Sequence, residues 1–275
     1  MSKKIFSVFL VALLLISAMG CKKWRNNRET LTSDDHTLAE ASFNSILSHV
    51  VMATSPLGEL LVDSCFTIQK SGSSFPQTIT VDFGSEDCPG LFGDEMKGRL
   101  VIVLGDSFNH TGAVAAVSIE DLYSKHYKVN GEFTIENLGV NSSGHPEYHL
   151  IVENGIITAE EDEAGEDYTI SWNCEYHYEL IERNNAQIMF DDLYQITGSA
   201  SGTNQEGRNF TATISEPLTK YLNCRWPGAG TTTIAPDDLK ERDLSYGDAC
   251  EPNSTCCDNI AMEIVKWPDQ TVRMK

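Results

Sequence analysis

The sequence predicts a mainly β protein, an antiparallel meander that forms a sandwich or a curved, partly closed barrel, with one amphipathic helix near the N-terminus. Two patterns support this prediction. From about residue 60 onward, polar and apolar residues alternate with the period of two that is typical of half-buried strands. The strand-like runs also follow one another at short intervals without helices between them, which favours antiparallel neighbours. Of the 275 residues, 41% are hydrophobic, which is enough for one sizeable core.

Residues 1–20 are expected to be a secretory signal peptide. Two lysines precede an apolar stretch at residues 5–16 that is too short to span a bilayer. Gly20 followed by Cys21 resembles a bacterial lipobox, in which cleavage makes the cysteine the acylated N-terminus. We therefore expect lipidation of Cys21, with a fatty acid such as palmitate as the membrane anchor. An ordinary signal peptide with a chance cysteine is the alternative.

The next segment, residues 21–36, is expected to be a polar tether. Lys22 stands where lipoproteins of the inner membrane commonly carry Asp, so this resemblance points to the outer membrane, facing either the periplasm or the exterior. Asp and Glu number 40 against 20 Lys and Arg, which gives a formal net charge of −20. This charge argues against nucleic acid as a partner, because a phosphate backbone requires a basic face, and against unaided docking onto anionic lipid.

Residues 37–55 are expected to form an amphipathic helix that packs on the β body. Thr37 and Glu40 have the spacing of a capping box at the start of a helix. The polar side carries serine, asparagine and histidine instead of lysine, so packing against the protein is favoured over a position on a membrane surface. A single apolar stripe at helical spacing consists of Ala39, Phe43, Ile46, Leu47 and Val50.

We expect one β-rich domain over residues 60–275, because no linker rich in proline or serine divides this region. The pairs Asn130-Gly131 and Asn154-Gly155 predict type I′ hairpin turns, in which both central residues need a positive φ. The runs predicted as strands are residues 77–83, 99–104, 113–120, 125–129, 132–137, 147–153, 167–182, 192–200, 208–215 and 260–266.

The chain contains 8 cysteines, of which the predicted acylation removes Cys21 from disulfide chemistry. An exported chain normally pairs its cysteines, which predicts up to three disulfides and one remaining thiol. Cys65 with Cys88 would join neighbouring strands, and Cys250 with Cys256 or Cys257 would close a tight loop, but spacing alone leaves the connectivity open. A metal site at the last three is disfavoured, because zinc sites prefer C-x2-4-C pairs. The candidate disulfide cysteines are Cys65, Cys88, Cys174, Cys224, Cys250, Cys256 and Cys257.

The predicted strand 167–182 gives the clearest assignment of faces. Alternation places Trp172, Cys174, Tyr176 and Tyr178 on one face, and this aromatic row is typical of a core. The opposite face carries a candidate ligand site, in which an imidazole between carboxylates is suited to general-base chemistry or to metal binding. A half-exposed ladder of surface residues explains the same pattern equally well. The candidate residues are Glu175, His177 and Glu179.

The densest group of charges in the chain lies at residues 160–167. Its carboxylates offer the oxygen ligands that calcium prefers, although the run lacks the order of an EF-hand loop. A solvated turn is the favoured interpretation, because runs of like charge repel one another and stay hydrated. Weak binding of calcium is thus the one cofactor hypothesis, and its residues are Glu160, Glu161, Asp162 and Glu163.

Several short motifs occur along the chain: residues 80–84 (TVDFG) with Cys88, residues 97–102 (KGRLVI), residues 127–131, residues 194–202, residues 246–248 and residues 257–259. Together these motifs resemble a family of uncharacterised Bacteroidota envelope lipoproteins. The resemblance covers nearly all of residues 60–275 and implies a lipid-anchored, β-rich, exported protein. It implies no activity or site, and the chain departs from the family at residues 249–256, where additional cysteines are inserted.

The sequence contains no G-x-S-x-G, H-E-x-x-H, G-x-x-x-x-G-K-[ST] or strand-linked G-x-G-x-x-G motif. We therefore expect a non-enzymatic, lipid-anchored envelope protein that binds a protein partner, a glycan or a cell-wall component. The alternative is an envelope hydrolase with an unrecognised active site. That alternative predicts a deep pocket with converging titratable groups, whereas a position of His177 on an open sheet surface would argue against it.

Overall fold

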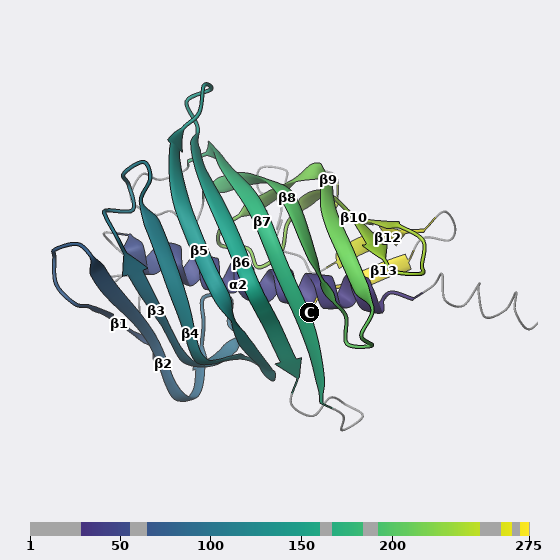
Figure 1. The fold of residues 1–275 in the computed structure, drawn as a ribbon, viewed down its shortest axis with the longest axis horizontal. Coiled ribbons are helices and arrows are strands. Elements are labelled where there is room, and N and C mark those ends of the chain that lie inside the picture. The colour runs from purple at the N-terminus through teal and green to yellow at the C-terminus, as the bar shows by residue number, and fades with distance from the viewer. Residues whose placement is uncertain are drawn as a thin grey trace, which may run out of the picture.

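One antiparallel sheet contains every strand in the described part of the computed structural model, which covers residues 29–55, 65–159, 167–183, 192–247, 260–265 and 270–274. The sheet has 13 strands, and each strand pairs with its neighbours in the sequence. The one helix among these described residues, α2 (Leu31–Thr54), runs across the strands (Figure 1). The predictions of a mainly β fold, an antiparallel meander and one N-terminal helix are therefore confirmed.

The strands cross the sheet in sequence order from β1 at one edge to β13 at the other. The sequence pattern does not predict four of them, β1, β10, β11 and β13, because they are short or rich in threonine and glycine. The bounds are β1 (Thr67–Lys70), β2 (Gln77–Pro89), β3 (Glu95–Leu104), β4 (Val114–Ser124), β5 (Tyr127–Val140), β6 (Pro146–Ala159), β7 (Tyr168–Glu182), β8 (Leu193–Thr203), β9 (Asn209–Tyr221), β10 (Ala229–Pro236), β11 (Arg242–Ser245), β12 (Ile260–Ile264) and β13 (Gln270–Arg273).

The sheet curves around the helix without closing on itself. Helix α2 contacts β2 near one edge, β7 in the middle and β13 at the other edge. One straight helix reaches strands this far apart only when the sheet bends around it. The sequence predicted a sandwich or a curved, partly closed barrel; the chain forms one curved sheet that stays open, and its inner face and the helix share one core.

Both Asn-Gly pairs lie inside strands, so the predicted type I′ turns are wrong. The pairing of β5 with β6 shifts register between Asn130 and Glu132, and the pairing of β6 with β7 shifts between Val152 and Gly155. These irregularities are β-bulges, which use the same positive φ that tight turns use; φ is +143° at Gly131. The predicted strands 125–129 and 132–137 consequently form the single strand β5.

The second bulge brings the sheet close to the helix. A Cβ at Gly155 would lie 2.2 Å from the carbonyl oxygen of Trp172 and 3.1 Å from the ring of Phe43 on α2. Only glycine fits at this contact. Because a bulge bends its strand and increases the local twist, the Asn-Gly pairs support the curvature that wraps the sheet around α2.

Helix α2 begins at Leu31 rather than at residue 37, so part of the predicted tether, residues 31–36, is helical and mostly buried. The predicted capping box does not form. The Thr37 hydroxyl donates to the backbone carbonyl of Asp34 inside the helix, and the side chain of Glu29 accepts the N–H of Thr32 instead. Contacts with the surrounding sheet stabilise the extra turn, and these contacts are not encoded locally.

The predicted polar side of the helix is buried together with its apolar stripe. Nearly every residue of α2 is buried, and its serine, asparagine and histidine side chains face the sheet instead of solvent. Ser48, for example, donates to the carbonyl of Leu222 at 3.1 Å. A helix buried on all sides with polar residues requires partners for each of them, since an unsatisfied buried polar group is costly.

Three aromatic residues of the predicted row on the inner face of β7 provide partners for polar side chains of α2. The Trp172 indole donates to His36 Nδ1 at 3.2 Å, and the Tyr178 hydroxyl donates to Asn44 Oδ1 at 2.9 Å. Between them, Glu40 accepts hydrogen bonds from the hydroxyls of Tyr176 and Tyr246, each at 3.0 Å. We call this set of bonds the internal seam; its members are His36, Glu40, Asn44, Trp172, Tyr176, Tyr178 and Tyr246.

The titration of the buried groups follows from their desolvation. Burial raises the pKa of Tyr176, Tyr178 and Tyr246 well above the ordinary value, so these phenols stay protonated and remain donors. Burial lowers the pKa of His36 and lowers that of His49 to about 4. The internal seam therefore consists of uncharged histidine, tyrosine, tryptophan and asparagine side chains together with one carboxyl group, that of Glu40.

The predicted pair Cys65–Cys88 forms a disulfide that ties the chain before β1 to β2. Cys224 is disulfide-bonded as well. Cys174 is a buried free thiol, which corrects its inclusion among the disulfide candidates, and burial raises its pKa. The other single-residue predictions, the acylated Cys21, the acidic residues 160–163 and the cysteines Cys250, Cys256 and Cys257, lie outside the described residues.

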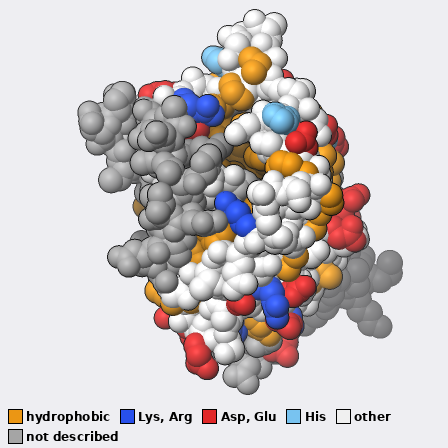
Figure 2. Space-filling model, turned by 90° about the vertical axis from the view of Figure 1, so that its left-hand side faces the viewer, with side chains coloured by type: hydrophobic (Ala, Val, Ile, Leu, Met, Phe, Trp, Pro, Cys, Tyr) orange, Lys and Arg blue, Asp and Glu red, His pale blue; other side chains and the backbone are white. Residues whose placement is uncertain are grey.

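The surface carries few cations. At the end of the molecule seen in Figure 2, Lys and Arg side chains are scattered among Asp and Glu and do not gather in a basic patch. Several of the described cations are paired with carboxylates, as Arg99 is with Glu120 at 3.1 Å. Among the described residues, no helix combines the length and the apolar character needed to cross a membrane.

Candidate functional site on the outer face of the sheet

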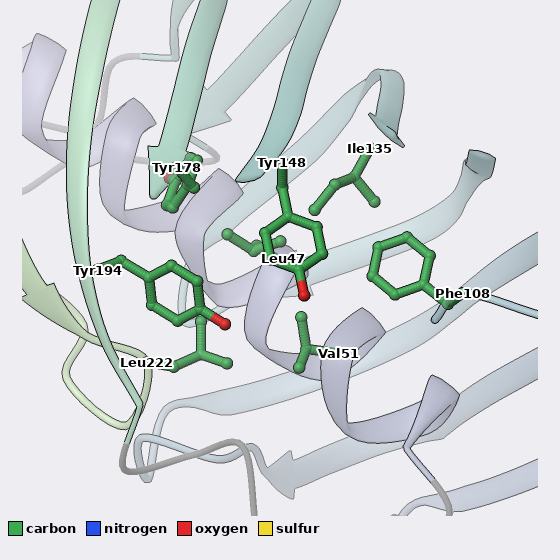
Figure 3. Close-up of a pocket in the computed structure, with 8 residues that line it drawn as sticks. All are labelled: Leu47, Val51, Phe108, Ile135, Tyr148, Tyr178, Tyr194 and Leu222. Carbon is green, nitrogen blue, oxygen red and sulfur yellow. The ribbon is translucent and has the colours of Figure 1, made fainter. Parts of the chain in front are cut away.

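The space between the helix and the sheet is filled by the protein's own side chains. One gap in the described part of the core lies between Leu47 and Val51 of α2 and the rings of Phe108, Tyr148 and Tyr194 on the sheet side (Figure 3). It measures about 10 Å³, which is room for roughly one water molecule. This gap is too small for a ligand, so among the described residues we consider next the outer face of the sheet.

The outer face of β7 carries the residues predicted as a ligand site. Glu175 and His177 are exposed and Glu179 is half-buried, and all three point away from the helix. The inward neighbours Tyr176 and Tyr178 are buried. The predicted division of this strand into two faces is therefore confirmed for both rows.

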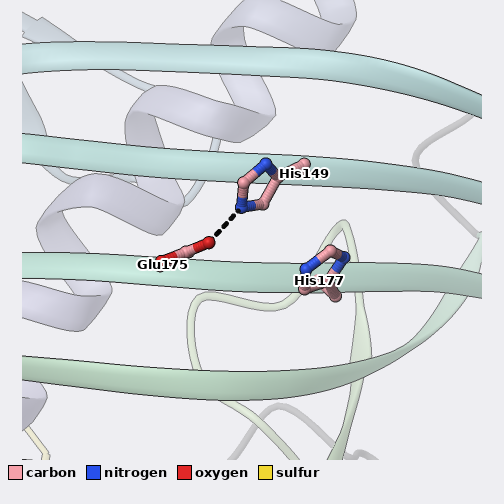
Figure 4. A group of neighbouring side chains, drawn as sticks. All are labelled: His149, Glu175 and His177. Carbon is pink, nitrogen blue, oxygen red and sulfur yellow. Dashed lines mark hydrogen bonds and ion pairs between the residues drawn. The ribbon is translucent and has the colours of Figure 1, made fainter.

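The neighbouring strand brings a second histidine to His177. In the β6–β7 pairing, His149 lies directly opposite His177, and the two rings stack with centroids 4.6 Å apart and planes inclined by 12°. His149 Nε2 also lies 3.1 Å from Glu175 Oε1 (Figure 4). One ligand atom from each of His149, Glu175 and His177 lies within 4.8 Å of the other two. We call these three residues the imidazole–carboxylate cluster.

Glu179 belongs to a different group, which corrects the predicted set. Its carboxylate accepts hydrogen bonds from His145 Nδ1 at 2.7 Å and from the Asn141 amide at 3.0 Å. These two bonds lower the pKa of Glu179, the His145 bond having the larger effect. Of the three residues predicted as a ligand site, the structure brings Glu175 and His177 together with His149, and it places Glu179 in another group.

The sequence held an incomplete signal for His149. Alternation within the predicted strand 147–153 puts His149 on the same side as Glu147 and Ile151. Which residue of β6 faces His177 depends on the register of β6 against β7, and neither strand's own residues determine that register. The sequence therefore predicted the face on which His149 lies, but it did not predict the register of β6 against β7.

A shallow groove borders this cluster on the same outer face. It runs over β6, β7, β8 and β9 with a volume of about 610 Å³, and Glu175 belongs to both the groove and the cluster. The side chains on β8 and β9 are short hydroxyls, which leaves the hollow between taller neighbours. Polar residues that line the groove include Glu153, Asn173, Glu175, Ser199, Ser201 and Thr213, and none of its described lining residues is a cation.

Comparison of the chain with protein-family models, with curated proteins and with solved structures finds no match in any of the three. The likeness to envelope lipoproteins accordingly remains an expectation from the sequence. Any function assigned to the chain therefore rests on the geometry of its described residues.

Proposed function

We propose that this chain is a non-enzymatic, lipid-anchored protein of the bacterial envelope that binds a glycan in the groove over β6–β9. The observation that carries the proposal is the division of the molecule into a filled inside and a hollowed outside. Helix α2 occupies the concave side of the sheet, where a curved sheet would otherwise enclose a small molecule. The outer face, in contrast, offers a groove of about 610 Å³.

The chemistry of the groove favours a neutral, polyhydroxylated ligand. The carboxylates of Glu153 and Glu175 accept hydrogen bonds from hydroxyl groups, the Asn173 amide both donates and accepts, and the Ser and Thr hydroxyls do the same. An anionic ligand would meet two carboxylates without a compensating cation among the described lining residues. Of the three ligand classes expected from the sequence, the glycan is thus the best match.

The position of His177 supports a binding role over the hydrolase alternative. A hydrolase needs groups that converge in a site from which water can be excluded. His177 is exposed on the outer surface of the sheet, and its partners His149 and Glu175 lie on that same open surface. The neighbouring pair of His145 with Glu179 is also partly exposed.

Glycan binding is tested with the soluble chain that begins after Cys21, applied to an array of neutral cell-surface and cell-wall oligosaccharides. We expect a saturable interaction that is lost in Ser201→Trp, because an indole at this exposed position fills the groove. Ser118→Trp is the matched control, since it adds the same ring to an exposed serine of β4 outside the groove. Absence of binding by the wild type, or equal loss in both variants, would refute the proposal.

The anchor is tested separately in cells. Wild-type protein should incorporate a labelled fatty acid and fractionate with outer membranes, whereas Cys21→Ala should take up no label. If the wild type takes up no label and Cys21→Ala still fractionates with membranes, lipidation is excluded.

A further inference from the structure

The imidazole–carboxylate cluster has the composition of a metal site. A metal ion bound at about 2.0–2.2 Å by nitrogen and oxygen ligands places those ligands roughly 3 to 4 Å from one another. The three ligand atoms of His149, Glu175 and His177 already lie within 4.8 Å. Small rotations of two exposed side chains and one half-buried side chain therefore bring them to bonding distance.

The backbone beneath the cluster is rigid. β6 and β7 lie in the middle of the sheet, each with a paired neighbour on both sides. On the inner face between Glu175 and His177, Tyr176 is buried and bonded to Glu40 of the helix. Ligands carried by rigid central strands are held more closely in place than ligands on loops, which reduces the entropy lost on binding.

The type of ligand selects the class of metal. Two imidazoles with one carboxylate suit Zn²⁺, Ni²⁺ and Cu²⁺, whereas Ca²⁺ and Mg²⁺ prefer a complete set of oxygen ligands. Three protein ligands also leave one or more coordination positions for water or for an external group. Because Glu175 also lines the groove, the free coordination positions of the metal would be accessible to solvent.

The surrounding charge favours a cation. Glu136 of β5 lies opposite His149 in the β5–β6 pairing, and Glu147 and Glu179 lie opposite each other one step further along β6 and β7. The formal net charge of the whole chain is −20. A divalent ion at the cluster would thus enter a region of negative potential, which increases its local concentration.

We propose that His149, Glu175 and His177 form a surface site for a divalent transition-metal ion, with Zn²⁺, Ni²⁺ and Cu²⁺ as the class of ligand. The hydrogen bond between His149 and Glu175 is the contact that the metal replaces. Two other described pairs serve as internal comparisons, His110 with Asp106 at 3.1 Å and His145 with Glu179 at 2.7 Å. Neither pair includes a second imidazole within reach of one ion in the described structure.

The test is a calorimetric titration of the soluble chain, stripped with EDTA, with ZnCl₂ and with NiCl₂. We expect one saturable site, and at least tenfold weaker binding in each of His149→Ala, His177→Ala and Glu175→Gln. The matched control is His110→Ala, which also removes an imidazole bonded to a carboxylate and should leave the affinity within twofold. Co²⁺ offers a second readout, because its visible absorption bands should appear with the wild type and vanish in the double variant His149→Ala/His177→Ala.

Two results would overturn the metal site. One is the absence of saturable binding in the wild type below millimolar metal. The other is an affinity that the double variant leaves unchanged. The thermal unfolding of each variant checks that the variant is folded. If His149→Ala does not fold, His177→Ala provides the test, because His177 is the more exposed of the two histidines.

The metal site goes beyond glycan binding and does not depend on it. Glycan binding measured with and without EDTA separates the two proposals. A metal site without glycan binding refutes only the proposed function, and glycan binding without a metal site refutes only the metal site.

Discussion

The two faces of β7 both carry polar groups, and they use them in different ways. On the inner face, Trp172, Tyr176 and Tyr178 each donate one hydrogen bond to a side chain of α2. On the outer face, Glu175 and His177 are exposed, and the bond from His149 to Glu175 lies on an open surface.

Because of this difference, polar groups on the inner face contribute to folding stability, whereas those on the outer face remain available for binding. A buried donor or acceptor that loses its partner costs about 1–3 kcal/mol, because water cannot replace that partner. An exposed group exchanges its partner for water at little cost, so its bonds contribute little to folding. The inner face therefore fixes the position of the helix, whereas the outer face keeps its ligand atoms available.

The largest effect should come from removing the central aromatic of the inner face. Trp172 is 1% exposed, and its ring stacks on that of Phe43 with centroids 5.4 Å apart. Trp172→Ala should lower the free energy of unfolding by about 3–5 kcal/mol, because it creates a cavity and leaves His36 without its donor. Urea unfolding measures this loss. Glu175→Ala on the outer face of the same strand is the control and should change stability by less than about 0.5 kcal/mol; similar losses in both variants would contradict the comparison.

The second effect is a dependence of stability on pH that originates in the interior. Burial lowers the pKa of His49 to about 4, below its value of 6.5 in the unfolded chain. Between pH 6.5 and 4 the unfolded chain therefore binds a proton that the folded protein does not, so stability is full above pH 6.5 and falls as the pH falls. The loss amounts to up to about 3 kcal/mol.

Urea unfolding from pH 8 to pH 4 measures this dependence, and His49→Gln should make it shallower. The remaining slope should include the contribution of His36, whose pKa burial also lowers. Equal slopes in the wild type and in His49→Gln would show that His49 is not protected from protons in the folded state.

A smaller effect should follow from removing a single hydrogen bond of the internal seam. Tyr176→Phe keeps the ring in the core and deletes the donor to Glu40, which should cost about 1–2 kcal/mol. A double-mutant cycle with Glu40→Gln, measured by chemical unfolding, should give a coupling energy on the order of 1 kcal/mol. A coupling energy near zero would mean that this bond does not help to hold the helix.

The smallest effect is expected for the outer pair of His145 and Glu179. Both side chains are partly exposed, so the 2.7 Å bond between them competes with water. His145→Ala should change the free energy of unfolding by less than about 0.5 kcal/mol. A loss well above that range would show that polar groups on the outer face also carry folding stability, and the comparison of the two faces would then fail.

Many features of the sheet could be predicted from the sequence because they depend on residues that are close together in the chain. Alternation along residues 167–182 assigned both faces of β7, including the buried aromatic row and the outward Glu175 and His177. The short intervals between strands predicted antiparallel neighbours, and the proximity of Cys65 and Cys88 suggested the disulfide that the structure contains. Each of these inferences uses residues that are close together in the chain.

The sequence by itself therefore determined the class of fold, the order of pairing and the face on which each β7 side chain lies. The tertiary structure alone decided that α2 begins at Leu31, that its polar side is buried, that the Asn-Gly pairs bend strands, and that His149 meets His177. The physical reason is the same in each case. Register, curvature and the extent of a buried helix depend on contacts between residues far apart in the chain. The residue pattern within one segment does not predict these contacts.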